Sequence, residues 1–170
     1  MPVLSREAIL KRLEASPPLV EGLLDREAQL QPNGVDLTLA SLARLATPGQ
    51  LGVRDAERVL SQRLPVEFDG AGWAQLAPGP YMCIFNEAVH LPRDTMAFGR
   101  TRSSLLRCGV SLHTAVWDAG YSGRSESLLV VYNLEGVRLA RNARVMQLVF
   151  LQLDRETDRG YAGRFLKENL

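Results

Sequence analysis

Apolar and polar residues alternate along most of this chain, and helical periodicity is confined to its N-terminal end. Ile9, Leu10 and Leu13 recur at the spacing of one helix face, and Ser5 stands where an N-cap is expected. The helix must end before Ser16-Pro17-Pro18, because proline lacks the amide hydrogen that a helix interior needs. The pattern therefore predicts one short N-terminal helix.

Period-two alternation predicts that the rest of the chain is mainly β-structure. Val35, Leu37 and Leu39 alternate with Asp36 and Thr38 after a Pro-Asn-Gly turn. Similar β-rich segments follow at short intervals, separated by turns that contain glycine or proline: Tyr81–Phe85, Thr95–Gly99, Val110–Val116, Leu128–Tyr132, Arg138–Leu139 and Val145–Leu153. Many short strands are typical of a jelly roll or a β-barrel. We therefore expect residues 1–170 to form a single, mainly β domain with a distorted jelly-roll or β-barrel fold.

Three segments depart from the strand pattern. Residues 46–72 are polar and contain several prolines and glycines, which predicts a long irregular excursion with room for a hairpin. A helical turn is expected at Arg102–Cys108, where two serines can cap and two leucines can be buried. Residues 155–170 are expected to form a C-terminal tail that closes over a ligand.

Composition narrows the classes of protein to consider. The chain has 20 Lys and Arg against 19 Asp and Glu, so it lacks the basic excess of a nucleic-acid-binding surface. Its two cysteines, Cys83 and Cys108, are too few for a disulfide framework and are expected to be reduced core thiols. No apolar stretch approaches the ~20 residues of a membrane-spanning helix, and the N-terminus lacks a signal-peptide pattern. We expect a cytoplasmic protein that binds neither nucleic acid nor membrane.

A cluster of arginine and serine residues is the first candidate site. It comprises Arg100, Arg102, Ser103 and Ser104, with Arg107 one turn further on. Forked guanidinium groups, hydroxyls and the amides of a helix N-terminus suit a polyphosphate. A capped surface turn with solvated arginines fits the same spacing, so both interpretations remain open.

The second candidate is Asp118, which follows an apolar strand and precedes Gly120 and Tyr121. A carboxylate beside apolar walls is able to deprotonate a water molecule, although aspartate in such turns more often caps the turn itself. Tyr121 fits either a core position or a plate against a sugar or base. His113 is more often structural than catalytic, and neither histidine shows zinc-ligand spacing with the cysteines.

Two further polar residues interrupt apolar strands. Asp36 points either into a site or toward solvent, since its neighbours in the sequence are apolar. Gln147 lies in an otherwise apolar strand, and a buried amide there must find hydrogen-bond partners.

Taken together, these motifs resemble, in content and order, the dCTP deaminase and dUTP diphosphatase superfamily, and within it most closely the archaeal-type dUTP diphosphatases. The similarity extends from Leu4 to the C-terminus. It is carried by four motifs in order: Gln31-Pro32 with Val35-Asp36-Leu37; Arg102-Ser103-Ser104-Leu105 with Arg107 and Gly109; His113-Thr114-Ala115 with Asp118-Ala119-Gly120-Tyr121 and Gly123; and Arg144 with Gln147-Leu148-Val149-Phe150.

The resemblance implies a dUTPase-like β-clip fold in a homotrimer, with active sites at the subunit interfaces. It implies that Asp118 activates the attacking water, Tyr121 lies under the deoxyribose, and Asp36 holds Mg²⁺ through water. Arg102 would act in both catalysis and phosphate binding. The remaining substrate-binding residues it implies are Ser103, Ser104 and Arg107 for the phosphates, His113, Thr114, Ala115 and Val116 for the base, Gln147 near the nucleotide, and Tyr161, Arg164 and Lys167 from the tail.

This resemblance implies hydrolysis of dUTP to dUMP and pyrophosphate. Deamination of dCTP is the alternative chemistry, and it needs a glutamate that this chain replaces with Leu128 or Val130, depending on the alignment. Glu126 lies on the same strand face as Leu128, but ~6.5 Å away unless a bulge changes the register. A bifunctional enzyme therefore stays open, and Glu126 otherwise pairs with an arginine.

Two more alternatives concern the tail and catalysis itself. Residues 161–165 are similar to the tyrosine-bearing tail of the deaminase branch, whereas ordinary trimeric dUTP diphosphatases close the site with a glycine-rich terminus. A non-catalytic nucleotide-binding regulator would keep Arg102, Ser103 and Gln147. It would have no need of Asp36 and Asp118 together, so their joint presence favours a hydrolase.

Overall fold

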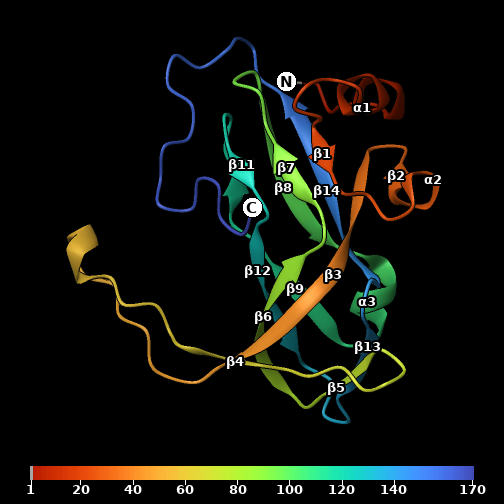
Figure 1. The fold of residues 1–170 in the computed structure, drawn as a ribbon, viewed down its shortest axis with the longest axis vertical. Coiled ribbons are helices and arrows are strands. Elements are labelled where there is room, and N and C mark those ends of the chain that lie inside the picture. Colours follow the sequence, from red (N-terminus) through yellow and green to blue (C-terminus); the bar gives the residue numbers. More distant parts are fainter. Residues whose placement is uncertain (1) are drawn as a thin grey trace.

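The computed structural model describes residues 2–170, and in these residues the strands form one main antiparallel sheet and two small ones (Figure 1). The expected single domain begins at Met1, which lies outside the described residues. The main sheet curls into a half-barrel, which confirms the expectation of a mainly β fold. Along it the strands are ordered β10 (Val116–Trp117), β8 (Thr95–Thr101), β14 (Arg144–Gln152), β3 (Gly34–Leu45), β6 (Gly79–Phe85), β12 (Glu126–Val131) and β9 (Val110–His113).

The other strands lie beside this sheet. The short β2 (Leu30–Gln31) and β4 (Arg63–Pro65) both pair with β3, while β1 (Val20–Glu21), β7 (Ala88–His90) and β11 (Ser122–Gly123) form a three-stranded sheet. A two-stranded sheet joins β5 (Trp73–Leu76) and β13 (Val137–Ala140).

The predicted N-terminal helix is confirmed as α1 (Arg6–Leu13). Ser5 caps it, because its hydroxyl accepts a hydrogen bond from the backbone amide of Ala8. Ile9 is fully buried, so the helix packs its apolar face onto the sheet. A second helix, α2 (Arg26–Gln29), was not predicted; it is a single turn capped by Asp25 and is too short to show periodicity.

The core follows the central strands. β3 is buried on both faces over its first half, and it pairs with β14 on one side and β6 on the other. Apolar side chains with no more than 2 % exposure fill the space between the layers: Val35, Leu37, Leu39, Phe85, Leu129, Met146, Leu148 and Phe150. A central strand buried on both faces explains why Asp36 and Thr38, which alternate with the leucines, are buried as well.

The polar excursion at residues 46–72 contains the expected hairpin. The end of β3 pairs with β4, a bridge joins Gln50 to Val59, and Figure 1 shows the intervening chain extending away from the body. We call residues 46–72 the arm. The chain reverses direction in it at a short 3₁₀ turn, Asp55–Glu57. Its apolar residues Leu51 and Val53 are exposed.

The expected strand Val110–Val116 is interrupted in the structure. β9 pairs with β12, whereas β10 pairs with β8, so the chain changes partner strands at Thr114 and Ala115. The hydroxyl of Thr101 accepts from the amide of Leu112 at 2.8 Å and donates to its carbonyl at 3.1 Å. This side chain occupies the backbone groups that a continuous strand pair would use, and it fixes the point of the crossover.

The cysteine prediction is half right. Both cysteines are free, and Cys83 is fully buried in β6, where burial raises the pKa of its thiol to about 12. Cys108, however, is exposed at the C-terminal end of the short helix α3 (Ser103–Arg107), so it is not a core residue.

Candidate functional site

The arginine and serine cluster forms one exposed helical turn. α3 begins after Arg102, and only its Leu105 side chain is buried. Ser103, Ser104 and Arg107 are exposed, so their hydroxyl and guanidinium groups face solvent. This arrangement is suited to an anionic ligand. The predicted helical turn at Arg102–Cys108 is present, but the expected serine cap is wrong, because Arg102 is the N-cap and no side chain caps the helix, and Leu106 is exposed rather than buried.

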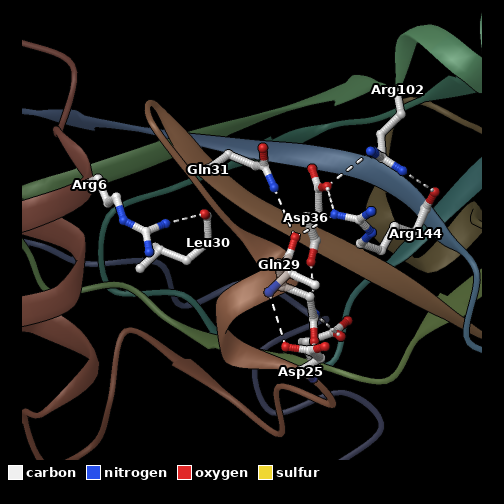
Figure 2. A network of polar contacts seen from close by, with 10 residues as sticks. Arg6, Asp25, Gln29, Leu30, Gln31, Asp36, Arg102 and Arg144 are labelled. Carbon is white, nitrogen blue, oxygen red and sulfur yellow. Dashed lines mark hydrogen bonds and ion pairs between the residues drawn. The ribbon is translucent and has the colours of Figure 1, made fainter.

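Asp36 lies beneath this turn and contacts two arginines (Figure 2). Its side chain is 2 % exposed, and its Oδ2 lies 3.0 Å from Nε of Arg102 and 3.3 Å from Nη1 of Arg144. Burial raises the pKa of Asp36, and the positive charges of the two arginines oppose that rise. Of the two orientations that the sequence left open, this burial excludes the one toward solvent.

A buried polar network fixes the backbone around Asp36. The side-chain amide of Gln29 donates to the Asp36 carbonyl at 2.9 Å and to the carboxylate of Glu87 at 2.6 Å. Glu87 also accepts from the amide of Thr38 at 2.9 Å and from its hydroxyl at 2.6 Å. Burial raises the pKa of Glu87, against the effect of these hydrogen bonds.

Asp118 stands at a different place on the sheet. It follows β10 at an exposed turn, where its carbonyl accepts from the amide of Tyr121 at 3.0 Å. Since Trp117 pairs with Ala97, Asp118 lies beside Met96, six residues before Arg102 along β8. At ~3.3 Å per residue along the strand, this separates the backbone at Asp118 from the start of α3 by ~20 Å. One chain does not bring the two halves of the predicted site together.

A cavity with a volume of about 410 Å³ lies beside the Asp118 turn, where Trp117 and Tyr121 line it. Four residues predicted to bind substrate line it: Ala115, Val116, Tyr121 and Tyr161. The rest of its wall comes from Trp117, from the arm through Leu60, Ser61 and Arg63, from the tail through Phe165 and Glu168, and from Leu45, Met82, Ser125 and Glu126. Apolar and aromatic walls with a few charged groups suit a small organic ligand.

Glu126 on the wall of this cavity is paired with an arginine. Its Oε2 lies 2.5 Å from Nη1 of Arg63, and its Oε1 accepts from the side-chain amide of Asn169 at 3.2 Å. The pairing of β12 with β6 runs from Glu126 to Val131 without a register shift. Glu126 therefore shares a strand face with Leu128, as expected, and no bulge moves it toward the position of Leu128.

The C-terminal tail packs against the same cavity. Tyr121 donates from its hydroxyl to Glu168 at 2.9 Å, and the rings of Tyr121 and Tyr161 meet edge to face with centroids 5.7 Å apart. Arg124 donates from its backbone amide to the Glu168 carbonyl at 2.9 Å and from its side chain to the Asn169 carbonyl at 2.6 Å. The tail thus forms one wall of the cavity.

The other predicted residues are scattered around these features. His113 is exposed and contacts the Tyr132 hydroxyl at 3.1 Å, and the Thr114 hydroxyl donates to the Gly99 carbonyl at 3.4 Å. Gln147 pairs across the sheet with Asp36 and with Arg100, on the side of the arginine and serine cluster. Arg164 and Lys167 are exposed on the tail.

The chain does not by itself form a magnesium site. Among residues 2–170, no three His, Cys, Asp or Glu side chains gather closely enough to hold a metal ion. Mg²⁺ requires oxygen ligands in near-octahedral geometry, and the buried Asp36 oxygen contacts two cations instead. These side chains do not fit direct coordination of the ion, and the expected contact of Asp36 with magnesium through water stays a prediction.

Several residues of these sites had no role predicted from the sequence. Arg144 contacts Asp36 from a strand 108 residues later, and Arg63 reaches Glu126 from the arm. Glu87 and Glu168 are buried or partly buried acids, and no local pattern marks them. The expected pairing of Glu126 with an arginine was the only signal, and it did not identify which arginine.

Comparison with known proteins places this geometry in a family. The family model described as dCTP deaminase-like matches residues 3–153. The chain is 45% identical over 170 residues to a probable deoxyuridine 5'-triphosphate nucleotidohydrolase of Methanococcoides burtonii, with 100% of both chains covered. It is 47% identical over 169 residues to the protein of that name from Methanosarcina mazei, with 99% of each covered. The corresponding protein of Archaeoglobus fulgidus is 45% identical over 170 residues, with 100% and 99% covered.

A solved structure supports the fold. The 2'-deoxycytidine 5'-triphosphate deaminase of Agrobacterium tumefaciens superposes with a TM-score of 0.66 at 22% sequence identity and covers 87% of this chain. The chain spans about half, 47%, of that deaminase chain. None of the described helices is long and apolar enough to cross a membrane.

Proposed function

The chain belongs to the dCTP deaminase-like family, and we propose that within it the protein is a dUTP diphosphatase that hydrolyses dUTP to dUMP and pyrophosphate. The full-length relatives at 45–47% identity carry this activity in their names. The structural observation that carries the proposal is the pairing of Glu126 with Arg63 and Asn169. Glu126 lies two residues before Leu128, one of the positions at which deamination needs a carboxyl group.

A deaminase needs a carboxyl group that exchanges protons with the cytosine ring. Leu128 and Val130 have no such group, and Glu126 is held by Arg63 and Asn169 in a regular strand pair. A carboxylate held by both of these partners is not free to swing toward the ring in place of Leu128. The geometry therefore favours hydrolysis over deamination, alone or in combination.

Hydrolysis needs a carboxylate near water, and Asp118 supplies one at an exposed turn beside the cavity. In this proposal Asp118 orients and deprotonates the water that attacks the α-phosphorus. Arg102, Ser103, Ser104 and Arg107 bind the phosphates, and Arg102 stabilises the charge that develops on the leaving pyrophosphate. Tyr121 and Tyr161 pack against the sugar and base in the cavity.

Magnesium also belongs to the proposal. Mg²⁺ would be held mainly by the triphosphate oxygens and water, and when bound it would neutralise phosphate charge.

The ~20 Å between Asp118 and α3 supports a site shared between subunits. An active site that needs both parts requires a second copy of the chain, and a closed ring of three copies would give three equivalent sites. The homotrimer is thus part of the proposed function, as is a cytoplasmic location.

Mixing two inactive variants tests the shared site. Asp118→Asn and Arg102→Gln each remove one part, so each homotrimer is expected to be inactive. Random mixed trimers would regain about one quarter of the wild-type sites, because a working site takes Asp118 from one variant and Arg102 from the other. Recovery near this level supports the shared site, whereas no recovery would place both parts within one chain.

Separate assays of two products test the activity. With Mg²⁺, dUTP is expected to yield pyrophosphate and dCTP no ammonia. Ammonia from dCTP would establish the deaminase alternative, and the absence of both products would favour a non-catalytic regulator. Asp118→Asn is expected to abolish turnover and retain nucleotide binding, while retained turnover would exclude Asp118 as the base.

A further inference from the structure

We propose that Asp36 is a positioning residue that orients Arg102 toward the triphosphate, and that it does not hold the magnesium ion. The inference rests on the proposed function, because it takes the phosphates as the target of Arg102. It departs from the magnesium contact that the family resemblance implies for Asp36, and it is carried by the contacts in Figure 2.

The geometry commits Asp36 to the arginines. Its side chain is 2 % exposed, and the same oxygen, Oδ2, contacts Nε of Arg102 at 3.0 Å and Nη1 of Arg144 at 3.3 Å. Gln29 fixes the Asp36 backbone by donating to its carbonyl at 2.9 Å. A carboxylate whose Oδ2 is held by two guanidinium groups, on a backbone that is itself fixed, has little freedom to turn toward another ligand.

The local charge also disfavours a cation at this position. One carboxylate lies between two guanidinium groups, so the cluster keeps a net positive charge. A dication approaching Asp36 would meet both arginines at close range, whereas a polyphosphate would be attracted. The cluster therefore has the charge of an anion-binding site.

The contacts of Arg102 leave one nitrogen of its guanidinium group, Nη2, available to a ligand. Its Nε contacts Asp36, its Nη1 donates to the Arg144 carbonyl at 3.3 Å, and its backbone amide donates to Val145 at 3.2 Å. Within residues 2–170, no hydrogen bond or ion pair joins Nη2 of Arg102 to another group. The Arg102 side chain is 28 % exposed and lies next to the hydroxyls of Ser103 and Ser104. Asp36 thus orients a guanidinium group whose Nη2 has no partner among residues 2–170 and is available to a ligand.

Nucleotide binding without magnesium separates the two roles of Asp36. The probe is the α,β-imido analogue of dUTP, titrated calorimetrically in EDTA and then with added Mg²⁺. Asp36→Asn is expected to weaken binding in EDTA about tenfold to hundredfold, because a guanidinium displaced by ~1 Å loses its hydrogen bonds. Removing a negative charge by itself would strengthen anion binding, so a loss of affinity reports lost orientation.

The magnesium response gives the second readout. In Asp36→Asn the Mg²⁺ concentration for half-maximal turnover is expected to stay within about twofold of wild type, since the ion contacts the phosphates rather than this side chain. Unchanged or stronger binding in EDTA, together with a higher Mg²⁺ requirement, would overturn the proposal and restore the metal contact. Asp69→Asn is the matched control, because it neutralises an exposed carboxylate that pairs with Arg138 and is expected to change neither readout.

A second variant leaves Asp36 in place. Arg102→Lys keeps the positive charge but lacks the fork, and is also expected to weaken binding in EDTA by tenfold or more. If Asp36 acts through Arg102, adding Asp36→Asn to this variant causes little further loss. Full additivity would overturn the proposal, and normal binding by Arg102→Lys would overturn it even if Asp36→Asn failed to fold. If the wild-type protein did not bind the analogue, the proposed function itself would fail.

Discussion

The hydroxyl of Tyr121 donates a 2.9 Å hydrogen bond to the carboxylate of Glu168, which lies 47 residues later in the tail. Burial, together with the neighbouring Glu168 carboxylate, raises the pKa of Tyr121, so the phenol keeps its proton and remains the donor. Burial also raises the pKa of Glu168, and the hydrogen bond from Tyr121 opposes this rise. The contact is one of several that join the tail to the cavity wall.

Replacing Tyr121 by Phe should loosen the tail while keeping the ring in the cavity wall. One lost hydrogen bond costs about 0.5–1.5 kcal/mol, so trypsin cleavage after Arg164 and Lys167 should become about two- to tenfold faster. Limited proteolysis followed by mass spectrometry measures this rate. Tyr132→Phe is the control, because Tyr132 is exposed and its hydroxyl contacts His113 rather than the tail, and it should leave cleavage unchanged. Equal cleavage rates in all three proteins would show that the hydrogen bond from Tyr121 does not hold the tail in place.

Gly120→Ala should separate the tail from the loop that carries Asp118. Gly120 has φ +86°, and a Cβ there would lie 2.8 Å from Cα of Gly160 and 3.0 Å from the amide nitrogen of Tyr161. Both contacts are to backbone atoms, so the tail must move, and the left-handed conformation adds about 1–2 kcal/mol of strain. Hydrogen exchange at residues 160–168 should therefore increase.

Gly70→Ala is the matched control for this change. A Cβ at Gly70 meets nothing within 4 Å, so neither stability nor exchange in the tail should alter. Normal protection of the tail in Gly120→Ala would mean that the tail does not rest on this loop.

Glu87→Gln should destabilise the fold although it changes only one atom. The carboxylate accepts from Gln29 and from both donors of Thr38, and an amide nitrogen would face one of these donors. Gln29 cannot turn its amide without losing the hydrogen bond to Asp36. A buried donor left without an acceptor lowers the free energy of unfolding by about 1–3 kcal/mol, which urea unfolding would detect. The exposed Glu67→Gln should be neutral, and equal stability of both variants would contradict the network.

Asp94 should make the stability of the fold sensitive to acid. Burial raises the pKa of Asp94, but contacts with Gln152, Arg12 and Thr95 outweigh it and lower the pKa to about 2 from 3.8. Arg12 belongs to α1, so the ion pair at 3.2 Å ties this helix to the sheet. Because the pKa is lower in the folded state, the stabilisation is present above about pH 4 and lost as the pH falls to about 2.

Calorimetry of the wild type and Asp94→Asn between pH 6 and 2 checks this sign. The unfolding temperatures should differ most above about pH 4 and converge toward about pH 2. A difference that stays constant over this range would show that the carboxylate charge contributes nothing.

Local signals account for the parts of the fold that the sequence predicted. The cap and apolar spacing of α1 depend on neighbouring residues, and so does the alternation along β3, β6, β8, β12 and β14. The motifs around Asp118 and the arginine and serine cluster were recognisable for the same reason. The short strands β1, β2, β7 and β11 were missed, because two or three residues carry no period.

Where predictions failed, a distant partner was decisive. The segment Val110–Val116 reads as one strand, but Thr101 and the two different partner strands divide it at Thr114. Cys108 reads as apolar, yet the short α3 leaves it exposed.

The sequence by itself determined the chemistry that is present: a mainly β domain, an exposed arginine and serine turn, an aspartate at a glycine turn, and a tail with tyrosine. Only the tertiary structure decided how these groups combine. It placed Asp36 between Arg102 and Arg144, paired Glu126 with Arg63, and kept Asp118 ~20 Å from α3. Periodicity reports which face of a strand is buried, because burial depends on nearby residues. The partner of a buried charge depends on strand order, which brings together residues as far apart as 108 positions.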